Sequence, residues 1–80
     1  MNRTSVVSSN LKSVGYDVYM AVLEIEFLSG SIYQYFNVPD SVYHELINAT
    51  SKGKFFARYI KNNKRYPRRK VFPESKWIHR

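Results

Sequence analysis

The chain has 80 residues, 44% of them hydrophobic and none of them cysteine, with thirteen basic and six acidic side chains. This length allows one domain with little apolar surface to spare for a deep catalytic cleft, and the absence of cysteine excludes disulfides and zinc–thiolate sites. The sequence has no run of about 18 apolar residues and no apolar segment near its N-terminus, so we expect a soluble, cytoplasmic protein without a membrane partner.

The charge is divided unevenly along the chain. Residues 1–50 carry two basic and five acidic side chains, a net charge of −3, whereas residues 51–80 carry eleven basic side chains and one acidic one, a net charge of +10. Like charges gathered on a small surface repel each other until an anionic partner neutralises them. The C-terminal third is therefore the first place to look for function.

Residues 18–38 predict a β-hairpin. Apolar residues recur at every second position, with Tyr19, Ala21, Leu23, Ile25 and Phe27 on one face and Met20, Val22, Glu24 and Glu26 on the other. Ser29-Gly30 is a turn signal, and residues 31–38 are again rich in aromatic and β-branched side chains. A weaker strand is expected within residues 6–16, ending at a turn at Gly15.

The length of the hairpin loop decides which face carries Tyr33 and Tyr35. A three-residue loop over residues 28–30, with Gly30 in the left-handed region, places both rings on the apolar face. The pairs are then Ile25 with Tyr33 and Leu23 with Tyr35. A two-residue loop would move both rings to the face of the glutamates. Because Ser-Gly is a poor two-residue loop, we expect the tyrosines to line the core.

Two helices are expected after the hairpin. Pro39-Asp40 predicts the start of the first, with Asp40 as its cap and with His44 and Asn48 on its outer face. The second starts at Ser51. Its apolar side contains Phe55, Phe56, Tyr59 and Ile60, and its basic side contains Lys54, Arg58 and Lys61.

Beyond the second helix the helical pattern ends. Residues 64–70 combine Pro67 with five basic side chains, which argues against a continuing helix and predicts a basic C-terminal arm. The sequence thus indicates an α+β domain, in which a small antiparallel sheet of about three strands packs against two C-terminal helices.

Four groups of residues occur in the order typical of a known family. They are Ser8-Ser9-Asn10, Gly15-Tyr16-Asp17, Leu23-x-Ile25-x-Phe27-x-x-Gly30-x-Ile32-Tyr33-x-Tyr35-x-x-Val38-Pro39, and Ala49-x-Ser51-x-Gly53-x-Phe55-Phe56. This series resembles the KTSC domain, which is found at the C-terminus of some lysyl-tRNA synthetases and alone in short bacterial and phage proteins. The resemblance covers residues 5–71, leaves residues 72–80 as an extension, and implies a suggested role in RNA binding.

The leading hypothesis is a non-enzymatic binding module for RNA, or for another single-stranded nucleic acid. The candidate phosphate-binding residues are Lys54, Arg58, Lys61, Lys64, Arg65, Arg68, Arg69 and Lys70. Aromatic side chains can stack on unpaired bases, and Tyr33, Tyr35 and Tyr66 are the candidates for this role.

Three alternatives remain open. The basic side chains can belong to an ordinary solvated helix face and a solubilising tail. They can also bind an acidic protein, as in a phage accessory protein that docks on a host surface. A minimal ribonuclease would have to use His44, for which the sequence shows no catalytic partner. We expect no metal ion or cofactor, because the carboxylates and histidines are too sparse to form a ligand set.

Overall fold

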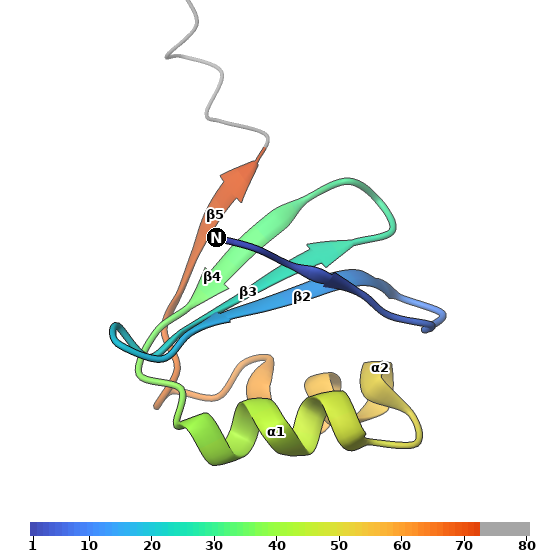
Figure 1. The fold of residues 1–80 in the computed structure, drawn as a ribbon. Coiled ribbons are helices and arrows are strands. Elements are labelled where there is room, and N and C mark those ends of the chain that lie inside the picture. The colour runs from blue at the N-terminus through green and yellow to red at the C-terminus, as the bar shows by residue number, and fades with distance from the viewer. Residues whose placement is uncertain (73–80) are drawn as a thin grey trace, which may run out of the picture.

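A computed structural model describes residues 1–72, which form one antiparallel sheet with helices packed on one of its faces (Figure 1). Within these residues the sheet has five strands in the order β1-β2-β3-β4-β5. The strands are β1 (Thr4–Ser5), β2 (Leu11–Asp17), β3 (Val22–Phe27), β4 (Ile32–Tyr35) and β5 (Arg68–Phe72). The helices are α1 (Asp40–Asn48), α2 (Lys52–Phe55) and the π-helical segment η1 (Phe56–Ile60). In the described part of the chain, no helix is long and apolar enough to cross a membrane.

The expected sheet of three strands is wrong, because the described chain adds one strand at each edge. β1 pairs with β2, and β5 pairs with β4. Residues 68–72 are therefore a strand rather than an arm. An edge strand tolerates charged side chains, which is why β5 has no apolar pattern to reveal it. Of the predicted extension, Phe72 ends β5 and residues 73–80 lie outside the described residues.

β3 and β4 pair in the register expected from a three-residue loop. Ile25 lies opposite Tyr33, and Leu23 lies opposite Tyr35. Gly30 has a φ of +101°, and its N–H donates a hydrogen bond to the carbonyl of Phe27 at 2.9 Å. The prediction that both tyrosines point to the apolar face is confirmed.

Gly15 does not end a strand, contrary to the prediction. It lies inside β2, opposite Glu24 of β3. The N-terminal segment crosses the sheet at this point, and a Cβ atom on Gly15 would lie 2.6 Å from the carbonyl oxygen of Asn2. The glycine is therefore explained by a close backbone approach rather than by a turn.

The turn before β3 follows Asp17 instead. Its carboxylate accepts hydrogen bonds from the backbone N–H groups of Tyr19 at 3.0 Å and of Met20 at 3.1 Å. Such a side-chain-to-backbone turn competes with strand formation. It removes residues 18–21 from the strand predicted to start at Val18 and leaves Tyr19 94% exposed.

The sheet face opposite the helices carries a row of polar side chains. Glu24 accepts hydrogen bonds from Arg3 and, at 2.8 Å, from the amide of Gln34. Gln34 in turn accepts one from Arg69 of β5 at 3.4 Å. Arg3 also lies 3.7 Å from Glu26. We call these five side chains the outer polar row. Both glutamates of β3 belong to it and lie on the face away from the tyrosines.

The helices cover the other face and close the core. Leu46 of α1 and Phe56 and Ile60 of η1 are buried in one cluster with residues of β2, β3 and β4. α2 starts after Ser51, as expected, and the hydroxyl of Ser51 accepts a hydrogen bond from the N–H of Lys54 at 3.4 Å.

Asp40 is not the cap of α1, although the helix begins where the sequence predicts. Pro39 occupies the cap position, and Asp40 lies one residue later, inside the helix. Its carboxylate lies 3.2 Å from Nε2 of His44, one turn further along the exposed face. The outer position predicted for His44 and Asn48 is confirmed, because both side chains are exposed.

Candidate nucleic-acid interface

A cationic segment runs from the second helix to the last strand. Residues 51–72 contain nine basic and no acidic side chains. The eight predicted phosphate-binding residues are all exposed, namely Lys54, Arg58, Lys61, Lys64, Arg65, Arg68, Arg69 and Lys70. They lie on α2, on η1, in the loop of residues 61–67 and on β5. All of them are therefore accessible to an anionic ligand.

β5 divides its cations between the two faces of the sheet. Paired residues of antiparallel strands point to the same face. Arg68 lies opposite Tyr35 and Lys70 lies opposite Tyr33, so both point to the side of the helices. Arg69 points the other way and joins the outer polar row. Adjacent basic residues of this strand thus face different surroundings.

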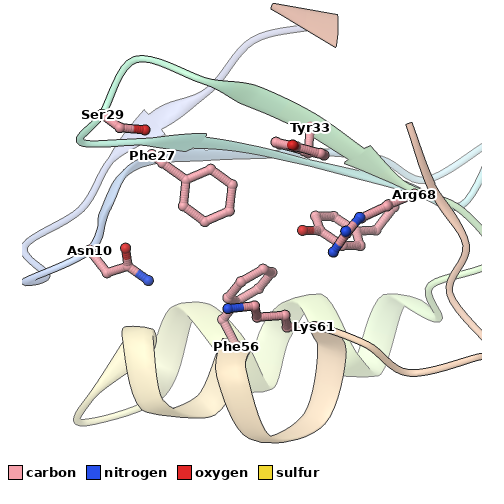
Figure 2. A pocket seen from close by; sticks show the side chains of 8 residues that line it. Asn10, Phe27, Ser29, Tyr33, Phe56, Lys61 and Arg68 are labelled. Atoms are coloured by element: carbon pink, nitrogen blue, oxygen red, sulfur yellow. The ribbon is translucent and has the colours of Figure 1, made fainter. Parts of the chain in front are cut away.

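A pocket of about 340 Å³ lies between the end of the β3–β4 hairpin and the end of η1 (Figure 2). Four aromatic rings form its walls, those of Phe27, Tyr33, Tyr35 and Phe56. Two cations, Lys61 and Arg68, and two polar side chains, Asn10 and Ser29, complete the lining. We call this site the aromatic pocket.

Phe27 meets two other rings of the aromatic pocket edge to face. The ring centroids of Phe27 and Tyr33 are 5.9 Å apart at 80°, and those of Phe27 and Phe56 are 5.5 Å apart at 64°. Tyr35 and Phe56 are 2% and 1% exposed, so they form the base of the pocket. Phe27 and Tyr33 are only half-buried and present part of their rings to it.

The pocket is positively charged. The guanidinium of Arg68 lies over the ring of Tyr33, 5.5 Å from its centroid, which is within the range of a cation–π contact. Burial raises the pKa of the Tyr35 hydroxyl, while the charge of Arg68 opposes that shift. Among the described residues, no acidic side chain lines the pocket. A planar anion would meet rings and cations there together.

The lining of the aromatic pocket is of the kind found at ligand sites. A mostly aromatic cavity with a few converging polar groups is typical of a ligand site. Within residues 1–72, no three carboxylate or imidazole side chains are placed to hold a metal ion. His44 does not line the aromatic pocket and has Asp40 as its neighbour on the exposed face of α1.

Comparison with known proteins assigns the family. The family model of the KTSC domain matches residues 7–66. The chain belongs to the KTSC domain family. A KTSC domain protein from Yersinia pestis, known from its crystal structure, has 39% sequence identity and a TM-score of 0.81, with 88% of this chain and 96% of that chain covered. The five-stranded sheet therefore belongs to a fold already seen in a KTSC domain.

Relatives of this KTSC domain occur both alone and within a larger enzyme. An uncharacterized protein of Stutzerimonas stutzeri is 43% identical over 61 residues, which cover 76% of this chain and 86% of that protein. A lysine–tRNA ligase of a Nostoc species is 47% identical over 58 residues, 72% of this chain. The matched region is only 10% of that ligase. The comparison thus concerns a small part of the enzyme.

The KTSC domain brings together only some of the predicted site residues. Tyr33, Tyr35, Lys61 and Arg68 meet in the aromatic pocket. Tyr35 is too deeply buried to stack on a base, so its proposed stacking role does not fit the structure. Tyr66 lies apart from the others, in a separate depression of about 490 Å³ that also contains Phe55 and Tyr59. Lys54, Arg58, Lys64, Arg65, Arg69 and Lys70 do not line the aromatic pocket.

Sequence reasoning missed Asn10 and Ser29 as site residues and placed Phe27 and Phe56 only in the core. Asn10 reaches the pocket because its carbonyl accepts a hydrogen bond from the N–H of Leu28, at the start of the hairpin loop. The one sequence feature that points to Asn10 as a site residue is its place in Ser8-Ser9-Asn10, a group that resembles the KTSC family.

Gly53 brings two of the groups of residues that resemble the KTSC family into contact, although they are far apart in the sequence. A Cβ atom at this position would lie 3.1 Å from Oγ of Ser8 and 3.7 Å from Cβ of Asn10. The start of the second helix therefore packs closely on the loop before β2. The Ser8 hydroxyl also accepts hydrogen bonds from the N–H groups of Asn10 and Leu11, at 3.2 and 3.1 Å. These contacts fix the loop at one end of the aromatic pocket.

Proposed function

We propose that this KTSC domain is a non-enzymatic module that binds RNA or another single-stranded nucleic acid. The observation that carries the proposal is the cationic segment, with nine basic and no acidic side chains in residues 51–72. Lysine and arginine side chains that neutralise phosphates release condensed counterions, which supplies most of the sequence-independent affinity for nucleic acid. On this proposal the segment provides affinity, with slight preference for sequence.

The lysine–tRNA ligase relative supports RNA as the first ligand to test. By its name, that enzyme acts on tRNA, and it contains a region 47% identical to this chain. A domain that increases the affinity of such an enzyme for its RNA needs no catalytic group of its own. The same domain in a short protein would bind RNA independently.

A second candidate function is the binding of an acidic protein. The observation that favours it is β5, which pairs with β4 and has no second partner strand among residues 1–72. An edge strand offers backbone N–H and C=O groups to an extended peptide. The basic side chains of β5 would select an acidic one.

The test is an electrophoretic mobility shift series with tRNA, single-stranded RNA and duplex DNA at increasing salt. The variant replaces four cations outside the aromatic pocket by glutamine: Lys54, Arg58, Lys64 and Arg65. We expect weaker binding to all sequences, and a plot of log affinity against log salt that flattens by about 0.7–0.9 for each phosphate that the variant no longer neutralises.

The control is Lys12→Gln, which removes an exposed cation outside the cationic segment and should leave the salt slope unchanged. Equal affinity and slope for the parent and the fourfold variant would reject the helix and loop part of the cationic segment as the phosphate-binding surface. If the parent shifts no nucleic acid and an acidic peptide binds to it instead, the second candidate function replaces the first.

A further inference from the structure

The aromatic pocket has properties that phosphate contacts on an open surface do not need. Contacts to a nucleic-acid backbone require exposed cations, which the cationic segment already supplies. Four rings around a cavity of about 340 Å³ add a recessed aromatic surface next to two of those cations. This volume lies within the range of about 300–1,000 Å³ that is typical of small-molecule sites.

We infer that the aromatic pocket receives one unpaired nucleotide, whose base contacts Phe27 and Tyr33 and whose phosphate pairs with Lys61 and Arg68. The inference rests on the proposed function and adds the place where a single base is held. A base in a duplex is stacked on both faces and cannot enter a recess, so the ligand is a nucleotide from a single-stranded region.

The aromatic walls suit a base because two of them are accessible. Phe27 and Tyr33 are half-buried, and their rings stand nearly perpendicular to each other, at 80°. A flat ligand can therefore stack on one ring and meet the other with its edge. The deeper rings of Tyr35 and Phe56 hold these walls in place through their own edge-to-face contact at 5.4 Å and 78°.

The cations suit a phosphate because they lie beside the rings and have no acidic neighbour among the residues lining the pocket. Lys61 follows directly after η1, and Arg68 is the first residue of β5. Figure 2 shows Arg68 at one end of the pocket, Asn10 and Ser29 at the other, and Lys61 between them beside Phe56. The guanidinium of Arg68 also lies 5.5 Å from the Tyr33 ring centroid, so base and phosphate sites are adjacent.

The polar end completes the match to a nucleotide. The amide of Asn10 has both donor and acceptor groups, and the hydroxyl of Ser29 can act as either. Nucleobases carry donors and acceptors around their edges, and proteins read unpaired bases through such edges. A ligand with a charged end, a flat body and a hydrogen-bonding edge fits the order of groups along the pocket.

The test is an NMR titration of the ¹⁵N-labelled full chain with AMP and UMP. Ribose 5-phosphate serves as a probe with a phosphate and no base, and adenosine serves as a probe with a base and no phosphate. We expect AMP or UMP to shift the amide signals of residues around the pocket, and to bind at least about 5-fold more tightly than either incomplete probe. Equal binding of AMP and ribose 5-phosphate would overturn the inference, because only the cations would then be used.

Substitutions separate the two halves of the site. Tyr33→Leu should weaken AMP binding about 5-fold or more, whereas Tyr33→Phe keeps the ring and should retain it. Arg68→Gln should weaken the binding of AMP and leave that of adenosine unchanged. Tyr19→Leu is the matched control, since Tyr19 is 94% exposed and does not line the pocket. If Tyr33→Leu loses its dispersed spectrum, Arg68→Gln still tests the inference. An Arg68→Gln variant that binds AMP as tightly as the parent does would overturn it.

Failure of this inference differs from failure of the proposed function. A domain that shifts single-stranded RNA while neither mononucleotide moves the pocket signals would bind RNA without using the aromatic pocket, and the inference would be wrong. A domain that binds AMP in the pocket and shifts no RNA would support the inference as a nucleotide site and would reject the RNA-binding module.

Discussion

Gly30 determines which face of the sheet the tyrosines of β4 occupy. Its positive φ closes a loop of three residues, and this loop places Tyr33 opposite Ile25. A loop shorter by one residue would turn both tyrosines toward the outer polar row, and the aromatic pocket would lose two of its four rings. A backbone dihedral outside the pocket thus decides what lines it.

Gly30→Val is expected to destabilise the domain by about 1–3 kcal/mol. A β-branched side chain is strained at a φ of +101°, even though no atom lies within 4 Å of the place its Cβ would take. Chemical denaturation would measure the free energy of unfolding. Ser29→Val makes the same residue type at the neighbouring exposed loop position and should stay within about 0.5 kcal/mol of the parent. Equal midpoints for the parent and Gly30→Val would contradict the loop geometry.

Single residues also mark the limits of reading this sequence. The sequence predicts a turn at Gly15, but the turn before β3 is made by Asp17 instead. Gly15 is required because the backbone at Asn2 passes close to it, and the residues around position 15 do not indicate this contact. This glycine therefore marks a close tertiary approach rather than a turn, and only the packing of the folded chain distinguishes the two.

At the scale of elements, the sequence predicts what is local and misses what is not. The β3–β4 hairpin and α1 follow from alternation, a turn glycine and helical spacing, all within short windows. β5 forms because residues 68–72 reach an open strand edge more than thirty positions earlier in the chain. Its five residues include three with a positive charge, so no window of sequence indicates a strand.

The rings and the cations of the candidate site could each be predicted from local sequence, but their meeting in one pocket could not. The register prediction placed Tyr33 and Tyr35 inward, and the charge pattern placed Lys61 and Arg68 outward. That the two groups meet in one pocket depends on the pairing of β4 with β5. The sequence showed rings and cations, and it did not show that they share a site.

Hydrogen exchange should rank the strands by their position in the sheet. β3 lies between β2 and β4 and contains Leu23 and Ile25, both fully buried. Its amides are expected to exchange only through global unfolding, whereas those of the edge strands β1 and β5 exchange faster through local fraying. NMR-detected exchange would measure this order. Protection of β5 equal to that of β3 would mean that the last strand is as firmly held as the centre of the sheet.

For the molecule as a whole, two tyrosines should make stability depend on alkaline pH. Burial raises the pKa of Tyr35, with Arg68 opposing, and burial followed by the charges of Asp40 and Asp17 raises the pKa of Tyr16. Between the ordinary tyrosine pKa of about 10 and these raised values, the folded state binds more protons than the unfolded state. The contribution of these two tyrosines to the free energy of unfolding should therefore be constant below about pH 10 and fall as the pH rises beyond it.

Urea denaturation from pH 8 to pH 11 would measure this loss. Tyr35→Phe keeps the ring and removes the ionisable hydroxyl, so its stability should fall less steeply above pH 10 than that of the parent. Tyr19→Phe, at a ring that is 94% exposed, is the control and should follow the parent curve. Parallel curves for Tyr35→Phe and the parent would show that the burial of Tyr35 does not control the alkaline response.

The alternation of side chains along β5 bears on how this domain can change during evolution. Arg69 ends the outer polar row, whereas its neighbour Arg68 borders the aromatic pocket. If the aromatic pocket binds a nucleotide as inferred above, a substitution of Arg69 alters a hydrogen bond of the sheet, whereas a substitution of Arg68 alters a contact to the ligand. A substitution of Arg68 during evolution would then remove ligand binding and leave the sheet intact. Two chemically identical neighbours would then drift at different rates, and one small domain could serve unlike hosts, from a short independent protein to a tRNA ligase.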